Sequence, residues 1–105
     1  MNIRFAPREV RFRVTRDELN QLLAGRSLAL HVALTGHHEF QATVAADRLG
    51  TWRFDSDPTG LWLTLPRKDL ETFVDGAPTA AGLEYGLDLP DGQRLELSFE
   101  VDVRS

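Results

Sequence analysis

The chain has 105 residues, of which 42% are hydrophobic, so it can bury one core but not two. Its 12 basic and 16 acidic residues leave a net charge of -4, which argues against nucleic acid as a partner. The absence of cysteine excludes disulfides, thiolate metal sites and a cysteine nucleophile. No apolar stretch approaches the roughly 18 residues of a membrane span, so we expect one cytoplasmic domain over residues 1–105, without membrane contact.

Taken in chain order, the first half of the sequence predicts two strands, a short helix and a hairpin. A first strand is expected at residues 3–7, and residues 10–14 alternate apolar and polar side chains as a half-buried strand requires. Leucines then follow at i, i+3 and i+4 spacing, which places them on one stripe of a helix. A hairpin over residues 28–44 completes a ββαββ unit.

The second half of the sequence repeats this order of elements. Residues 61–76 superpose without a gap on residues 10–25, and residues 83–99 match residues 28–44 after a longer loop. Coincidence between two similar strand patterns is the alternative explanation. Identical residues at matching helix positions favour duplication.

Upstream of the gapless match, IRF at residues 3–5 is aligned with WRF at residues 52–54, which requires a longer turn in the second copy. The sequence therefore predicts a β-rich α+β fold of two ββαββ repeats, at about 1–47 and 50–105. Because neither repeat is large enough to be stable alone, we expect them to pack about a pseudo-twofold axis. The product is an eight-stranded barrel or sandwich with two short helices.

The ends of the two helices are indicated by different residues in each copy. Thr15 and Glu18 form a capping-box pattern at the start of the first helix, and Pro66 is predicted to open the second. Gly25 and Gly76 stand where a helix ends in a residue of positive φ.

The tip of the first hairpin, LTGHHEF, contains two of the three histidines. The second hairpin predicts a three-residue loop at residues 90–92, so residues 35–37 are expected to form the same loop. His38 would then face the core side of the hairpin end. His31 and Glu39 would face outward, diagonal to each other and close enough for their side chains to meet.

One interpretation of this tip is a metal site formed by His31, His37 and Glu39, since imidazole and carboxylate are both zinc ligands. The other is a plain hairpin tip. The second copy has Gln93 and Arg94 in the places of His38 and Glu39, so the fold itself does not need histidine there. We therefore expect no bound metal and no cofactor.

Arginine is concentrated near the start of the chain. Arg4, Arg11 and Arg13 alternate with apolar residues and are expected on one outer face. The last hairpin has an acidic outer face by the same alternation. The two hairpins either pair these charges across neighbouring strands, or the basic face receives an acidic partner.

Trp62 is predicted to point outward, because its neighbours Leu61 and Leu63 alternate toward the core. Arg53 is also expected to point outward from the preceding strand, where it can stack on the indole ring. An exposed tryptophan beside an arginine is typical of an interface hot spot. The alternative is that a helix or loop covers the indole.

The opening residues, MNIR followed by RFRVTRDEL, resemble a family of short bacterial proteins known only as a domain of unknown function. Its members begin M-[KN]-I-R and continue R-x-R-[LV]-T-[KR]-x-E-[LV] into a short helix that ends in glycine. The match covers chiefly Met1 to Gly25. The resemblance implies a bacterial origin and a compact β-rich fold, and it brings no known activity. The chain lacks the cysteine-containing C-terminal extension of those members, so a metal or redox role of such a tail has no support here.

The motifs of P-loop, serine-hydrolase and zinc-protease sites are all absent from the sequence. We therefore expect a non-enzymatic interaction module that binds a protein partner or a second copy of itself. The expected partner-binding residues are Arg4, Arg11, Arg13, Arg53 and Trp62. The alternative is a small-molecule or metal binding protein, or a minor enzyme, that uses a cavity between the repeats or the hairpin tip. The tip residues in that case are His31, His37, His38 and Glu39.

Overall fold

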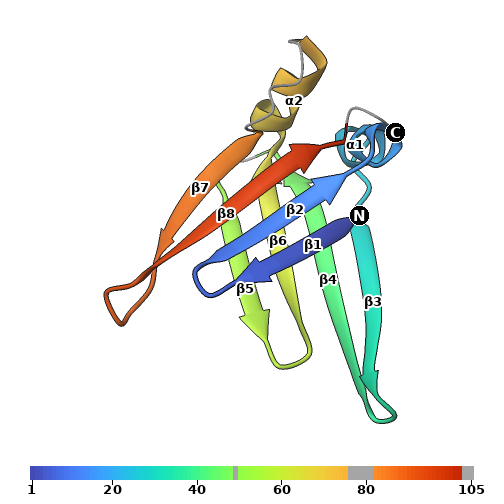
Figure 1. Ribbon diagram of the computed structural model, residues 1–105. Helices are drawn as coiled ribbons and strands as arrows, with labels where there is room; N and C mark the ends of the chain where they lie inside the picture. Colours follow the sequence, from blue (N-terminus) through green and yellow to red (C-terminus); the bar gives the residue numbers. More distant parts are fainter. Residues whose placement is uncertain (49, 76–81, 103–105) are drawn as a thin grey trace.

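The computed structural model describes residues 1–48, 50–75 and 82–102, apart from the side chains of residues 74 and 75. These residues form eight strands and two helices (Figure 1). The elements of the first half are β1 (Asn2–Ala6), β2 (Glu9–Val14), α1 (Arg16–Leu23), β3 (Leu28–Thr35) and β4 (His38–Asp47). Those of the second half are β5 (Arg53–Asp57), β6 (Gly60–Pro66), α2 (Arg67–Asp75), β7 (Leu83–Asp88) and β8 (Arg94–Val101).

The strands form two four-stranded sheets, and each sheet takes one hairpin from each half of the chain. Sheet A has the order β1-β2-β8-β7 and sheet B the order β3-β4-β6-β5. In each sheet the two central strands are parallel, while the outer pairs are antiparallel hairpins. The predicted ββαββ repeats are confirmed. The open choice between barrel and sandwich is resolved as a sandwich of two separate sheets.

The strand register shows how closely the two halves correspond. Ile3 pairs with Phe12, and Phe54 pairs with Leu63, so the matching residues of the first hairpins are a constant 51 positions apart. The predicted alignment of Ile3 with Trp52, and with it the longer turn, is therefore wrong. That alignment followed a short identical dipeptide, whereas cross-strand pairing keeps the hairpins equal in length.

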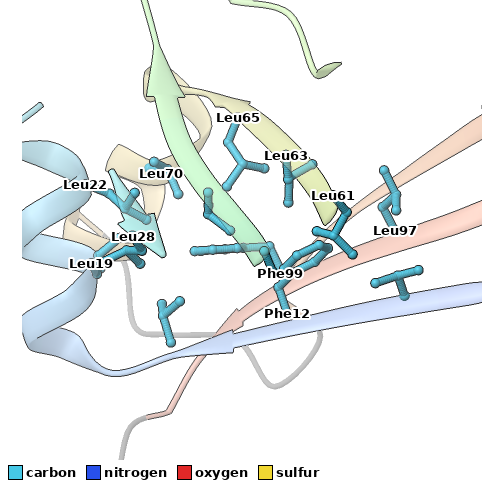
Figure 2. Packing of buried hydrophobic residues seen from close by; sticks show 14 residues of the cluster. Phe12, Leu19, Leu22, Leu28, Leu61, Leu63, Leu65, Leu70, Leu97 and Phe99 are labelled. Carbon is cyan, nitrogen blue, oxygen red and sulfur yellow. The ribbon is translucent and has the colours of Figure 1, made fainter. Parts of the chain in front are cut away.

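The hydrophobic core lies between the sheets and under the helices. Buried residues from both halves form one cluster, which Figure 2 shows with Phe12 of β2 close to Phe99 of β8. The helices contact each other, and Figure 1 shows them together at one end of the sandwich. Leu22 of α1 and Leu70 of α2 are fully buried there. Each short helix is thus held by packing rather than by its own propensity.

The ends of α1 match the sequence prediction. Thr15 Oγ1 accepts from the Glu18 N–H at 3.1 Å, and Glu18 Oε1 accepts from the Thr15 N–H at 2.9 Å, which completes the capping box. At the other end the Arg26 N–H donates to the Gln21 carbonyl, and Gly25 has a φ of 89°. This is the Schellman arrangement, which requires positive φ at the glycine position.

The start of α2 differs from the prediction. Pro66 is the last residue of β6, and α2 begins at Arg67, so the proline precedes the helix rather than opening it. Pro66 thus occupies the place of Thr15 and has no side-chain oxygen to cap the helix. The predicted helix end at Gly76 lies outside the described residues.

Each helix start is tied to the beginning of its repeat by a matching contact. The Met1 ammonium donates to Glu18 Oε2 at 2.7 Å, and Trp52 Nε1 donates to Asp69 Oδ2 at 3.0 Å. Burial alone would raise the pKa of Glu18, but bonds from the ammonium group and from Thr15 hold it below its ordinary value. Trp52 is half-buried and also stacks on Tyr85, with ring centroids 5.2 Å apart.

Replacing Thr15 with alanine is expected to lower the free energy of unfolding by about 0.5–2 kcal/mol, because the Glu18 N–H loses its side-chain acceptor. Urea denaturation followed by circular dichroism measures this loss. Asn20→Ala is the matched control, since this exposed position on the same helix makes no side-chain bond among the described residues. A Thr15→Ala protein as stable as the control variant would contradict the capping role.

Candidate functional site on the outer face of sheet B

The outer face of sheet B has a hollow of about 260 Å³ with a tryptophan in its wall. Its lining residues come from β3, β4, β6 and the turn that joins β5 to β6: His31, Glu39, Gln41, Thr59 and Trp62. The hollow therefore combines one large aromatic side chain with a polar rim. Chemically, it offers an apolar contact together with hydrogen-bond donors and acceptors.

Trp62 lies on the inner strand β6 and points outward, because Leu61 and Leu63 on either side of it are buried in the core. It stands between Thr43 of β4 and Asp55 of β5. The indole is half-buried, which falls between the two alternatives that the sequence left open.

His31 and Glu39 form the side of the hollow nearest the sheet edge. His31 is paired with Gln41 and Glu39 with Ala33, so the two side chains are diagonal neighbours as expected. Their closest atoms, His31 Nδ1 and Glu39 Oε1, lie 3.9 Å apart, and both side chains are largely exposed.

His37 and His38 do not join this pair. His37 lies in the turn after β3, and His38 points to the other face, where its Nε2 lies 2.8 Å from the Pro58 carbonyl oxygen. Among the described residues, no group of three or more histidine, cysteine, aspartate or glutamate side chains is arranged to hold a metal ion.

The turn at this tip is not the predicted three-residue loop. Thr35 pairs with His38 across a two-residue turn, and the register shifts between Ala33 and Thr35. The second hairpin does form the expected loop, in which Gly92 has a φ of 83°. The matching position here is His37, and a side chain disfavours that left-handed conformation.

The rim on the β5 side is held by the turn from Asp57 to Gly60. The Thr59 hydroxyl and N–H both donate to Asp57 Oδ1, at 2.5 and 2.7 Å. These bonds, first from the hydroxyl and then from the N–H, hold the pKa of Asp57 below its ordinary value. Thr59 is thereby fixed beside the hollow.

The predicted basic face lies on sheet A, whereas Trp62 lies on sheet B. Arg13 approaches Glu100 at 3.3 Å, and Arg11 approaches both Glu9 at 3.3 Å and Glu100 at 3.8 Å. The first and last hairpins are thus neighbours that pair their charges, as one of the two interpretations required. Arg4 is exposed and has no ion pair within the described residues.

Arg53 lies on sheet B with Trp62 but does not stack on it. Its Nη2 donates to Asp47 Oδ2 at 2.9 Å, and the described residues include no cation–π contact between Arg53 and the indole. The structure therefore separates the five predicted partner-binding residues into two faces. It also brings His31 and Glu39 beside Trp62, a grouping with Gln41 and Thr59 that the sequence analysis missed.

The fold and this surface define a class of protein: a β-rich α+β sandwich of two ββαββ repeats with an aromatic hollow on one outer face. The chain belongs to a family of unknown function, DUF7009, whose model matches residues 1–104. The expectation of an uncharacterised family is confirmed. No curated protein matches the chain. Neither described helix has the length and apolar content that crossing a membrane would require.

Proposed function

We propose that the protein is a non-enzymatic interaction module that binds a protein partner through the outer face of sheet B. The observation that carries this proposal is the half-buried Trp62 in a polar-rimmed hollow. Tryptophan is enriched among residues that dominate binding energy, particularly where a polar rim excludes water around it. Arg53 stands on the same sheet and adds a cation near this face.

The size of the hollow favours a protein partner over a free small molecule. Sites for small ligands have volumes of roughly 300–1,000 Å³ and enclose most of the ligand. The hollow at Trp62, at about 260 Å³, is smaller and open to one side. It fits a single side chain of a partner that covers the surrounding sheet.

The arginines of sheet A have less support as partner-binding residues. Arg11 and Arg13 already face Glu9 and Glu100, so a partner would have to compete with these carboxylates. Arg4 is free of such competition within the described residues and remains part of the proposal as a second, separate contact.

Replacing Trp62 with alanine is expected to weaken partner binding about tenfold or more, as loss of a hot-spot side chain does. Affinity capture from the source cell identifies the partner, and titration calorimetry with that partner measures the change. Phe5→Ala is the matched control, because Phe5 is an exposed aromatic residue on sheet A. Recovery of the same proteins by wild type and Trp62→Ala would refute the proposal.

A further inference from the structure

The β3 strand is an edge of sheet B and is open along most of its length. It pairs with β4 on one side, and no other described strand pairs with it. After Leu28, which is buried beside α1, every residue of β3 except Leu30 is exposed. Val32 and Leu34 are 37% and 54% exposed, although both are large apolar residues.

The backbone of β3 has hydrogen-bonding groups at this edge that no described strand pairs with. The Gln41 N–H donates to the Thr59 carbonyl at 3.0 Å, so Gln41 directs its backbone groups away from β3. Its antiparallel partner His31 is therefore in a non-hydrogen-bonded pair with it, and His31 directs its own N–H and C=O away from β4. Hydrogen-bonded and non-hydrogen-bonded pairs alternate along an antiparallel ladder, so Ala29 and Ala33 also direct their N–H and C=O groups away from β4.

The sequence of β3 is nearly palindromic, so two antiparallel copies of the strand would place residues of similar type opposite each other. Residues 28–34 read LALHVAL, with His31 at the centre. In an antiparallel pair of two such strands, Ala29 stands opposite Ala33 and Leu30 opposite Val32. Small residues would meet on the outer face and branched apolar residues on the inner face, and no charge would be buried.

The other edge strands, β1, β5 and β7, are shorter than β3 and contain charged residues. β1 and β5 have five residues each and β7 has six, and all three carry charged side chains. β3 has eight residues and no aspartate, glutamate, lysine or arginine. Natural edge strands are usually kept short or charged because an open, apolar edge invites another strand.

The comparison with β7 is the sharpest, because β7 is the counterpart of β3 in the second repeat. Its residues at the places of Ala29 and Ala33 are Glu84 and Asp88. If two β7 strands paired in the same way, these carboxylates would stand directly opposite each other, which is destabilising. The fold therefore blocks this edge in one repeat and leaves it open in the other.

We propose that two copies of this chain pair through β3, antiparallel, about a twofold axis at His31, to form one continuous eight-stranded sheet. Such a contact is isologous, since the same residues are used on both copies, and it closes at two. The axis runs perpendicular to the sheet, so both Trp62 faces lie on the same side. The pairing does not depend on the proposed function of that face.

His31→Lys tests the pairing, because it sets two lysines directly opposite each other at the twofold axis, where their like charges repel. Within each copy the new lysine still has Glu39 as a neighbour of opposite charge, so the monomer should tolerate the change. Sedimentation equilibrium of the wild type should give twice the chain mass of 11.8 kDa. The dissociation constant of His31→Lys should be about tenfold higher or more. His37→Lys, the same change in the turn outside the paired segment, should behave as wild type.

Amide hydrogen exchange measured by NMR is a second test of the pairing, and it requires no variant. The amides of Ala29, His31 and Ala33 should be protected at high concentration and lose protection on dilution. Those of Leu30 and Val32 bond to β4 and should stay protected throughout. A far-ultraviolet spectrum like that of the wild type, and a similar urea midpoint at a dilution where both proteins are monomeric, would show that His31→Lys leaves the monomer fold intact.

A wild type that is monomeric, with fast exchange at those three amides, would overturn the proposal. Growth beyond two copies would also overturn it, because that requires an edge other than β3. Protection that appears only when a different protein is added would assign the edge to that partner instead of a second copy.

Discussion

Replacing Phe99 with alanine is expected to lower the free energy of unfolding by about 3–5 kcal/mol, the largest effect of any change considered for this protein. Phe99 is fully buried, and it pairs with Phe12 of β2 and Leu83 of β7 at the centre of sheet A. Its ring also packs against Phe73 of α2, with centroids 6.1 Å apart. The substitution therefore opens a cavity where the two repeats and a helix meet.

Such a loss is a large share of the roughly 5–15 kcal/mol that stabilises a typical native protein. Urea denaturation followed by circular dichroism gives the free energy of unfolding for each variant. Phe5→Ala removes the same side chain from a position that is 63% exposed, and is expected to change stability by less than about 1 kcal/mol. Equal losses in the two variants would mean that Phe99 does not occupy the core position described.

Replacing Gly60 with alanine is expected to cost about 1–3 kcal/mol, although the change adds a single methyl group. A Cβ atom at this position would overlap the backbone carbonyl oxygen of Gln41 on the parallel strand β4. Backbone cannot rotate out of the way as a side chain can, so the contact between β4 and β6 must open. This is the contact that joins the two repeats in sheet B.

Gly36→Ala is the control for this prediction, because a Cβ at Gly36 meets nothing within 4 Å and its φ is not positive. Its effect on stability should stay within about 0.5 kcal/mol. The same denaturation series measures both variants. A Gly60→Ala protein with the same urea midpoint as Gly36→Ala would show that β4 and β6 do not approach each other as closely at Gly60 as described.

Much of the fold was predictable because its signals are local. The alternation of apolar residues in β2 and β6 predicted which face of each strand is buried, and the capping box at Thr15 was confirmed. The loop at residues 90–92 was also confirmed, since the Leu89 N–H donates to the Gln93 carbonyl across it and Gly92 has the positive φ that such a turn demands. The single domain over residues 1–105 stays a prediction.

Two predictions were wrong because they were transferred from one repeat to the other without regard to the residues present at each position. The loop at residues 35–37 was copied from the second hairpin, but His37 stands where that hairpin has Gly92. The alignment of Ile3 with Trp52 favoured a matching dipeptide over equal hairpin length. In both cases a backbone requirement, rather than residue similarity, decided the structure.

The candidate site was only half predictable. Strand alternation showed that Trp62, His31 and Glu39 all point outward. Whether they meet depends on the parallel register of β4 with β6, which sets Trp62 beside Thr43 and brings Gln41 within reach. No local pattern contains that register, because it joins hairpins from different repeats.

The sequence by itself determined the elements, their buried faces and the twofold repetition, because periodicity and capping depend on residues close together in the chain. Only the tertiary structure decided that each sheet takes one hairpin from each repeat. It also decided that the sandwich stays open, that Arg11 and Arg13 face glutamates, and that no described strand pairs with the outer edge of β3. These outcomes depend on contacts between residues that are distant in the chain, so the sequence pattern of a single segment does not contain them.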